Sequence, residues 1–537
     1  MSDKNVKKRS ATEKHQAESA KKSDSKLSRA QIEVISRLGD KYWRMNHLYK
    51  IRNQDGKVVV FKFNELQQKL WDDHWFFNVL LKARQFGGTT WICIYFLDDV
   101  LFTKGLEAGI IAHRREDAEK IFRRKIRFPY DNLPEGLKSA VPLERDTTSE
   151  LVFGNGSSIY VTTSARSGTV QRLHISEYGK ICAKMPEKAL EIKTGALNAV
   201  HPGGHIWIES TAEGRFGDFF DRCQTARNLK LAGKKLSRIQ YEFHFFPWFW
   251  DSKNQLPTNE AALIEIRPEM AKYFAEIEAK STDIHGNPLH LSHEQRAWYQ
   301  LKYDDQGDDE MFREYPSTYD EAFNAAVKGG YFSDQMAAMR REKRIGRVPW
   351  DPNLPVDTTW DIGMDAYTVI IYHQRYMQEN RVIDLDWDSG DAVEEYCRLI
   401  QTKPYTYGTH WLPHDGRVRD WGGTGKSRVD TMRKLLPGHR IQLAPGPQEV
   451  NRDTGIQMTR RLLATTFIDE TKCDKLVRML EGYRRVPDEK HGGFKPYPVE
   501  DECCHFADAM RIRAITFKYR AQTGKKPKRR RRNAAVV

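Results

Sequence analysis

A glycine-containing loop follows a short apolar run within the first hundred residues. Residues 77–91 read FNVLLKARQFGGTTW. Loops that bind nucleotide phosphates commonly read G-x-x-x-x-G-K-[ST] and open a helix, so that backbone N–H groups and the lysine hold the phosphates. Here Gly88 stands where that lysine would be, and the nearby cations are Lys82 and Arg84. The pattern predicts a phosphate-binding loop with a displaced lysine, although a strand, a turn and a helix with two solvated cations would look the same.

Two further apolar segments of the first half end in residues that could do chemistry. The segment QRLHISEYGKI predicts a strand that ends at Glu177. Parallel-sheet ATPases place an acidic pair at such an end, the first to hold Mg²⁺ through water and the second to activate the attacking water. Here the pair is Ser176-Glu177, so the second residue is retained and the first is not. The segment HIWIESTAEG predicts another strand, which ends in Ser210 and Thr211, where a loop could sense the γ-phosphate.

Three carboxylates of the second half could bind divalent metal ions. Residues 358–374, TTWDIGMDAYTVIIYHQ, predict a strand that carries Asp361, then a turn and a second strand. Asp415 follows another short apolar strand, and EDECCHFADAMRIRAITF predicts a helix with His505 and Asp508 one turn apart on one face. If the fold brings the carboxylates to one sheet edge, two Mg²⁺ or Mn²⁺ ions held there could stabilise both the attacking and the leaving oxygens of a phosphodiester displacement.

The order of the first-half motifs resembles that of the large subunits of tailed-phage terminases. Those proteins carry an N-x-x-Q helix, a K-x-R-Q-x-G-x-[ST] loop, an apolar strand ending in S-E or D-E, and an S-T-A-x-G segment. This chain has Asn64 with Gln67, the loop, Ser176-Glu177 and STAEG in the same order. The resemblance implies that Gln67 contacts adenine, that Glu177 activates water, and that two further groups of residues bind ATP and couple its hydrolysis to movement. The implied ATP-binding residues are Gln67, Lys82, Ala83, Arg84, Gln85, Phe86, Gly87, Gly88, Thr89 and Thr90, and the implied coupling residues are Ser210, Thr211, Ala212 and Gly214.

The second half resembles the nuclease domain of the same family. That domain carries D-x-G-x-x-D early, P-H-D in the middle and H-x-x-D-A near its end. This chain has P-H-D at 413–415 and H-x-x-D-A at 505–509, and its early segment from Asp361 to Asp365 has the shorter spacing D-x-G-x-D. The resemblance implies that Asp361, Asp415 and Asp508 are catalytic and bind metal. Four nearby residues are candidates to support these ligands, namely His414, His505, Asp365 and Asp501.

The implied fold class is α/β, with a P-loop (ASCE-type) parallel-sheet ATPase domain followed by an RNase H-like nuclease domain. A chain of 537 residues is long enough for two cores. The predicted divisions are a basic tail over 1–35, the ATPase domain with a lid subdomain over 36–340, a linker over 341–357, the nuclease domain over 358–524 and a basic tail over 525–537.

Positive charge is concentrated near the two ends of the sequence. Residues 1–29 hold nine Lys and Arg against four Asp and Glu, and residues 524–537 hold seven Lys and Arg and no acid. The whole chain carries +14, so the middle is nearly neutral. Basic segments of this kind attract phosphate backbones without reading sequence, or could contact an acidic partner. The seven cysteines show no C-x-x-C spacing and predict buried thiols, and no apolar stretch is long enough to span a bilayer.

The resemblance implies an ATP-driven motor that translocates double-stranded DNA into a procapsid and an endonuclease that cuts concatemeric DNA. The implied cofactors are ATP and Mg²⁺ (or Mn²⁺), and the implied partners are double-stranded DNA, the portal protein, the terminase small subunit and a ring of further copies, pentameric in the family. The implied location is the host cytoplasm and transiently the portal vertex, but not the mature virion. Two alternatives stay open: a helicase–nuclease of a repair or defence system, and a DNA-binding scaffold with a degenerate ATPase site, which Gly88 and Ser176 would suit.

Overall fold

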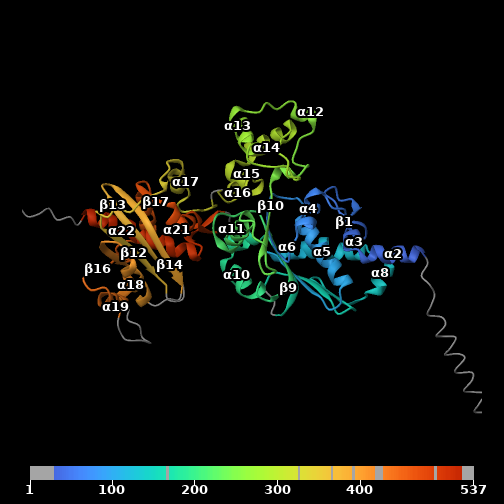
Figure 1. Cartoon of the computed structure of the whole chain (residues 1–537), viewed down its shortest axis with the longest axis horizontal. Coiled ribbons are helices and arrows are strands. Elements are labelled where there is room, and N and C mark those ends of the chain that lie inside the picture. The colour runs from blue at the N-terminus through green and yellow to red at the C-terminus, as the bar shows by residue number, and fades with distance from the viewer. Residues whose placement is uncertain are drawn as a thin grey trace, which may run out of the picture. The chain divides into compact units, whose positions relative to one another are not determined.

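Contacts within the chain separate it into two compact units, and Figure 1 labels many of their elements. The first unit comprises the described residues up to Asp73, Gly87–Thr163 and Gly168–His174, and the second comprises His74–Phe86, Ser164 and the described residues from Ile175 onward. The computed structural model describes residues 29–164, 168–324, 327–363, 367–389, 393–417, 427–488 and 493–522.

The first unit combines helices with a four-stranded mixed group of strands. These strands pair in the order β4-β7-β6-β5, with β4 and β7 parallel and the other neighbours antiparallel. A separate hairpin pairs β1 with β2. The elements are α2 (Arg29–Gly39), α3 (Lys41–His47), β1 (Lys50–Arg52), β2 (Val58–Val60), α4 (Glu65–Asp73), α5 (Gly88–Phe102), β4 (Glu107–Ile111), α6 (Arg115–Ile121), the π-helical turn η1 (Phe122–Arg127), α7 (Phe128–Asp131), α8 (Glu135–Ala140), β5 (Leu143–Asp146), β6 (Glu150–Phe153) and β7 (Ser158–Thr162).

Helix α5, which follows the glycine-containing loop, is the central helix of the first unit. It is apolar on all sides and almost wholly buried, so its two acidic residues need partners inside the protein. Asp98 accepts hydrogen bonds from the Arg44 guanidinium, 2.7 Å away, and from the Tyr49 hydroxyl, 2.8 Å away. Asp99 pairs with Lys41 and Arg172, each at 2.6 Å. These buried pairs hold α3 against α5.

Strand β8 (Val170–Ser176) carries the chain from the first unit into the second. The second unit begins with three parallel strands in the order β10-β3-β9. Their register places Leu81 opposite Ser210, and Phe246 opposite Lys82, so the three strands end at one edge. The elements are β3 (Phe77–Lys82), α9 (Tyr178–Lys184), α10 (Pro186–Glu191), the π-helical turn η2 (Ile192–Ala196), β9 (Val200–Ser210), α11 (Gly217–Leu231) and β10 (Tyr241–Phe246).

A mostly helical segment rich in aromatic residues follows β10. Trp248 and Phe249 are buried in a core with Phe274 and Tyr299. The elements are the 3-10 turn η3 (Trp248–Trp250), α12 (Thr258–Ala261), α13 (Pro268–Glu278), α14 (His293–Gln306), α15 (Asp308–Glu314) and α16 (Tyr319–Asn324).

The rest of the second unit is built on a seven-stranded mixed sheet. Its strand order is β11-β17-β14-β13-β12-β15-β16; β12, β13 and β14 are antiparallel neighbours, and the outer pairs are parallel. The elements are α17 (Ser333–Arg341), β11 (Ile345–Gly346), β12 (Val356–Ile362), β13 (Tyr367–Tyr376), β14 (Glu379–Ser389), α18 (Val393–Thr402), β15 (Tyr407–Leu412), the 3-10 turn η4 (His414–Arg417), α19 (Arg428–Leu435), β16 (Arg440–Leu443), α20 (Arg452–Leu463), β17 (Thr466–Asp469), α21 (Glu470–Gly482), β18 (Arg485–Pro487), β19 (Phe494–Pro498) and α22 (Glu502–Gln522).

Strand β13 shows why helices cover both faces of this sheet. Successive side chains of a strand point to opposite faces. Val369 and Ile371 join the core that contains residues of α20, α21 and α22, whereas Ile370 and Tyr372 join the core that contains residues of α18 and α19. The continuous apolar run in β13 therefore marks a strand buried on both sides, as expected inside an α/β domain.

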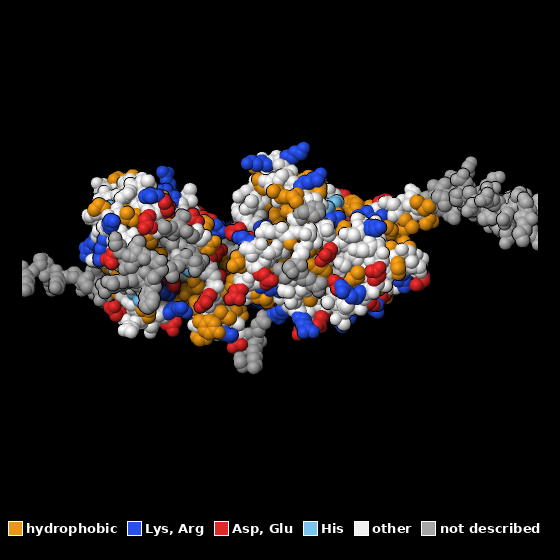
Figure 2. All heavy atoms as spheres, turned by 90° about the horizontal axis from the view of Figure 1, so that it is seen from below, with side chains coloured by type: hydrophobic (Ala, Val, Ile, Leu, Met, Phe, Trp, Pro, Cys, Tyr) orange, Lys and Arg blue, Asp and Glu red, His pale blue; other side chains and the backbone are white. Residues whose placement is uncertain are grey.

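The surface carries charges of both signs. On the face shown in Figure 2, Lys and Arg side chains are interspersed with Asp and Glu side chains, in keeping with the nearly neutral middle of the sequence. All seven cysteines are free thiols, six of them buried, as predicted. None of the helices in the described residues is both long enough and apolar enough to cross a membrane.

Candidate active sites

The glycine-containing loop joins β3 to α5. Lys82 is the last residue of β3, and α5 begins at Gly88. The backbone N–H of Ala83 donates to the Phe246 carbonyl and that of Arg84 to the Glu314 carbonyl, both at 2.9 Å. Gln85 and Gly87 have positive φ values of 69° and 91°. The predicted strand, loop and helix are therefore present, with a backbone shape that favours glycine at position 87.

Gln67 lies against this loop. Its backbone N–H donates to Asn64 Oδ1 at 2.8 Å, and the Asn64 N–H donates to Gln67 Oε1 at 3.1 Å, so the N-x-x-Q spacing forms a reciprocal cap at the start of α4. The Gln67 side chain also donates from Nε2 to the Gly87 carbonyl at 3.2 Å. A Cβ at position 87 would lie 2.8 Å from that nitrogen. Gln67 thus holds the loop, and its predicted contact with adenine stays a prediction.

Lys82 is a buried cation between two carboxylates. Its Nζ lies 3.4 Å from Glu177 Oε1 and 3.6 Å from Glu209 Oε2, and only 8% of its side chain is exposed. Burial alone would lower the pKa of Lys82, but the negative charges of Glu209 and Glu177 outweigh burial and raise it. Lys82 is therefore charged, as a phosphate-binding lysine must be.

Glu177 occupies the junction of β8 and α9 in a left-handed conformation, with φ 57° and ψ 44°. Such backbone strain in a residue other than glycine is concentrated at functional sites. Burial would raise the pKa of Glu177, but Lys82 and Lys180 overcome this and lower it; Lys180 Nζ lies 2.8 Å from Glu177 Oε2. The carboxylate is therefore ionised and able to accept a proton from water.

The end of β9 adds two hydroxyl groups near α9. Ser210 and Thr211 are buried, and within the described residues their hydroxyl oxygens have no hydrogen-bond partner. Gly179 lies so close that a Cβ there would stand 2.8 Å from Ser210 Oγ. Buried hydroxyls normally find partners, so this arrangement suits a polar ligand or water. Ala212 is fully buried, and Gly214 has a positive φ of 113°.

The remaining loop residues differ in their surroundings. The Arg84 side chain is 56% exposed, with Nη1 3.5 Å from Glu314 Oε2. Phe86 packs edge-to-face on Phe246, with ring centroids 5.2 Å apart. Thr89, the loop threonine, is partly buried in the first turn of α5. Thr90 lines a cavity of about 710 Å³ in the first unit together with Arg52, Arg123, Arg124 and Lys125. That basic lining, which the sequence analysis did not single out, suits an anionic ligand.

A second candidate site lies where β12 meets α22. Asp361, near the end of β12, has its Oδ2 2.8 Å from His505 Nδ1 of α22. This hydrogen bond to Asp361 raises the pKa of His505. Burial raises the pKa of Asp508, and the negative charge of Asp361 adds to that effect, although Arg511, 2.7 Å from Asp508, opposes it. Asp361 and His505 are thus in contact, and Asp508 lies near enough for the charge of Asp361 to raise its pKa.

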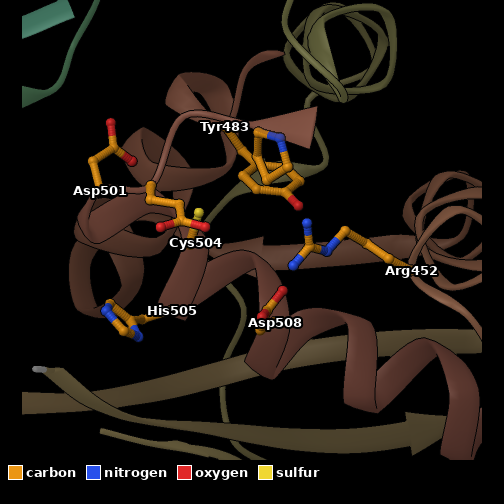
Figure 3. Close-up of a pocket in the computed structure, with 8 residues that line it drawn as sticks. Arg452, Tyr483, Asp501, Cys504, His505 and Asp508 are labelled. Atoms are coloured by element: carbon orange, nitrogen blue, oxygen red, sulfur yellow. The ribbon is translucent and has the colours of Figure 1, made fainter. Parts of the chain in front are cut away.

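The pocket beside these residues has a volume of about 350 Å³. In Figure 3, His505 and Asp508 project from one helix, and the guanidinium of Arg452 points toward the Asp508 carboxylate. The positive charge of Arg452 also lowers the pKa of Asp508, against the effect of burial. Arg452, at the start of α20, was missed by the sequence analysis because no local motif surrounds it.

Asp415 is less closely associated with this site. It lies in η4, three residues beyond β15, and β15 runs parallel to β12, so both strands lead to the same sheet edge. Asp415 is exposed, and no hydrogen bond or ion pair joins it to another described residue. Within the part of the chain that the structure describes, no three His, Cys, Asp or Glu side chains stand close enough to hold a metal ion together. The metal-binding role of Asp415 stays a prediction.

The supporting residues proposed from sequence have different surroundings. His505 contacts Asp361, whereas His414 is exposed in η4. Asp501 accepts a hydrogen bond from the Cys503 N–H at 3.0 Å and pairs with Arg484 at 2.8 Å, so it caps α22. Asp365 lies outside the described residues.

Glu209 is a further residue that the sequence pattern did not single out. It is fully buried in β9, immediately before Ser210. The sequence did contain a signal, namely a glutamate inside the apolar run HIWIES. A glutamate in a buried strand is rarely found without a specific partner.

The chain is similar to several solved protein structures, although its sequence matches no known family. No family model and no curated protein match the chain. The chain is similar to the large terminase of bacteriophage HK97, with 12% identity and a TM-score of 0.44, over 88% of this chain and 99% of that one. The ATPase domain of the Thermus phage P74-26 large terminase matches with 14% identity and a TM-score of 0.31, over 48% of this chain and 94% of that one. The nuclease domain of the bacteriophage SPP1 large terminase, with bound Mn, matches with 20% identity and a TM-score of 0.24, over 30% of this chain and 86% of that one. The sheets and the helices packed on them, described above, confirm the predicted α/β fold class.

Proposed function

We propose that this chain is a terminase large subunit, which hydrolyses ATP to translocate double-stranded DNA into a procapsid and cuts concatemeric DNA with a metal-dependent endonuclease. The observation that carries the proposal is the pairing of motifs far apart in sequence. Lys82 meets Glu177, and Asp361 meets His505, at two separate strand ends. Together with the order of the motifs along the chain, this supports two chemistries on one polypeptide.

The proposed ATPase site contains a cation, a carboxylate and two hydroxyl groups, and each has a physical role. Lys82 supplies positive charge to the phosphates, and Glu177, ionised through Lys82 and Lys180, accepts a proton from the attacking water. The buried hydroxyls of Ser210 and Thr211, which have no hydrogen-bond partner among the described residues, would contact the bound phosphate. Mg²⁺ bound with ATP would neutralise charge that develops on the phosphate oxygens.

In the proposed nuclease site, Asp361 and Asp508 would hold the divalent ions, with His505 beside them. The donor set fits hard cations, because carboxylate oxygens are the ligands that Mg²⁺ and Mn²⁺ prefer. The raised pKa of Asp508 reports burial next to another carboxylate, a cost that a bound cation would relieve. Two ions at such a site would stabilise the attacking and leaving oxygens of the phosphodiester. His505, hydrogen-bonded to Asp361, orients that carboxylate.

The partners and the location are part of the proposal. We expect double-stranded DNA, a portal protein, a terminase small subunit and a ring of further copies, pentameric by resemblance, to be the partners. The chain would act in the host cytoplasm and at the portal vertex, and would be absent from the mature virion.

The test is to assay the purified full-length protein for two activities. We expect ATP hydrolysis that double-stranded DNA stimulates, and plasmid cleavage that requires Mg²⁺ or Mn²⁺. Glu177→Gln and Asp361→Asn serve as matched controls, each removing one activity. Nucleotide binding without turnover would favour the DNA-binding scaffold, and ATP-dependent strand separation would favour the helicase–nuclease.

A further inference from the structure

Glu209 is a buried carboxylate in the proposed ATPase site. The sequence motifs gave it no role. It lies in β9, whose register with β3 places it opposite Leu80, two residues before Lys82. Its side chain is fully buried, and Oε2 lies 3.6 Å from Lys82 Nζ. Burying a carboxylate costs free energy unless its charge has a specific partner. The presence of Glu209 inside β9 therefore indicates a specific role.

Ser176 lies beside Glu209, on β8. Ser176 Oγ lies 3.4 Å from Glu209 Oε1. Position 176 is where parallel-sheet ATPases carry the acid that holds Mg²⁺, and a serine hydroxyl cannot supply a negative charge there. The position that lacks a carboxylate, Ser176, is therefore next to a buried carboxylate, that of Glu209.

The two lysines of the site are shared unequally between the two carboxylates. Lys82 faces two carboxylates, Glu177 and Glu209, and Lys180 approaches Glu177 from its other oxygen. If Lys82 turns to the phosphates of bound ATP, Glu177 keeps Lys180, while Glu209 loses its lysine. A divalent ion that arrives with the nucleotide would replace that lysine as the partner of Glu209.

We propose that Glu209 is the metal-side carboxylate of the ATPase site and takes the place of the acid absent at position 176. The inference rests on the proposed ATPase function. The two carboxylates around Lys82 then have different roles, because Glu177 accepts the proton of water and Glu209 holds Mg²⁺, directly or through water. The site thus retains the acidic pair of its class, with one member moved from β8 to β9, its neighbour in the sheet.

The competing explanation is that Glu209 only keeps Lys82 charged and in place. Metal dependence of nucleotide binding separates the two roles, because a counter-ion of Lys82 would affect binding equally with and without metal. The affinity for a fluorescent ATP analogue is measured in Mg²⁺ and in EDTA for the wild-type chain, Glu209→Gln, Glu177→Gln and the double variant Ser176→Asp/Glu209→Gln. The midpoint of thermal unfolding of each variant is recorded alongside.

We expect Mg²⁺ to strengthen binding to the wild-type chain and to Glu177→Gln. In Glu209→Gln this strengthening should fall by about tenfold or more, with binding in EDTA preserved. Ser176→Asp should restore it in the double variant, since the carboxylate returns to its usual strand. Wild-type metal dependence in Glu209→Gln would overturn the proposal, and so would a double variant that stays insensitive to Mg²⁺. A wild-type chain that binds no nucleotide at all would instead refute the ATPase function itself.

Discussion

Replacing Lys82 by methionine removes the buried positive charge of the proposed ATPase site at nearly constant volume. Lys82 Nζ lies 3.6 Å from Glu209 Oε2. At an effective dielectric constant of about 20, two unit charges at that distance attract by roughly 5 kcal/mol. Breaking a buried pair by removing one partner typically costs about 3–5 kcal/mol, because the other charge is left uncompensated. Glu177 keeps Lys180 at 2.8 Å, so Glu209 accounts for most of the expected loss.

The same change should nearly abolish ATP hydrolysis. A positioned charge in a water-excluded site commonly contributes a factor of roughly 100–1,000 to turnover. The assays are steady-state ATP hydrolysis and calorimetric unfolding, in which the transition of the unit that contains Lys82 should move to lower temperature.

The matched control for Lys82→Met is the double variant Lys82→Met/Glu209→Gln. It removes the negative charge of Glu209 together with the positive charge of Lys82, so most of the lost stability should return while hydrolysis stays absent. The reasoning is refuted if Lys82→Met hydrolyses ATP at the parental rate. It is equally refuted if the double variant is no more stable than Lys82→Met, because the cost would then not arise from Glu209.

Four further changes test the two sites. Glu177→Gln should bind ATP without hydrolysing it, because an amide cannot accept the proton of water, and should still nick plasmid DNA in Mn²⁺; loss of both activities in a folded variant would count against separate sites. Asp361→Asn should lower DNA cleavage by orders of magnitude with ATPase activity near normal, and equal loss of both would contradict the nuclease assignment. The hydrogen bond to Asp361 raises the pKa of His505. Without metal, the stability that this hydrogen bond contributes is therefore complete below about pH 6 and is lost as the pH rises through the raised pKa. A stability difference between the wild-type chain and His505→Gln that is independent of pH would disprove this pairing. Gly87→Ala should weaken nucleotide binding and cost about 1–2 kcal/mol, because φ is 91° and the added Cβ would lie 2.8 Å from Gln67 Nε2; unchanged nucleotide binding would show that the loop tolerates another shape.

Local pattern was sufficient to predict the elements that carry the motifs. Strand β3 and helix α5 flank the loop where the apolar run and the glycines indicated, and α22 extends through the helical pattern that contains His505 and Asp508. These predictions succeed because hydrophobic period and turn residues act over a few neighbouring positions. The order of the motifs likewise needs no three-dimensional information.

Tertiary structure alone decided which side chains meet. Glu209 reaches Lys82 because β9 pairs with β3 in one register, and a shift of one residue would turn its side chain to the opposite face. Arg452 points toward Asp508 from a helix that begins 56 residues earlier in the chain. No local sequence motif surrounds Arg452, so the sequence alone did not predict this approach. Asp415, which has its motif, stays exposed at the sheet edge. Types and spacings of residues determine which chemistry is available, whereas strand register and helix placement determine distance, and distance decides which charges act on one another.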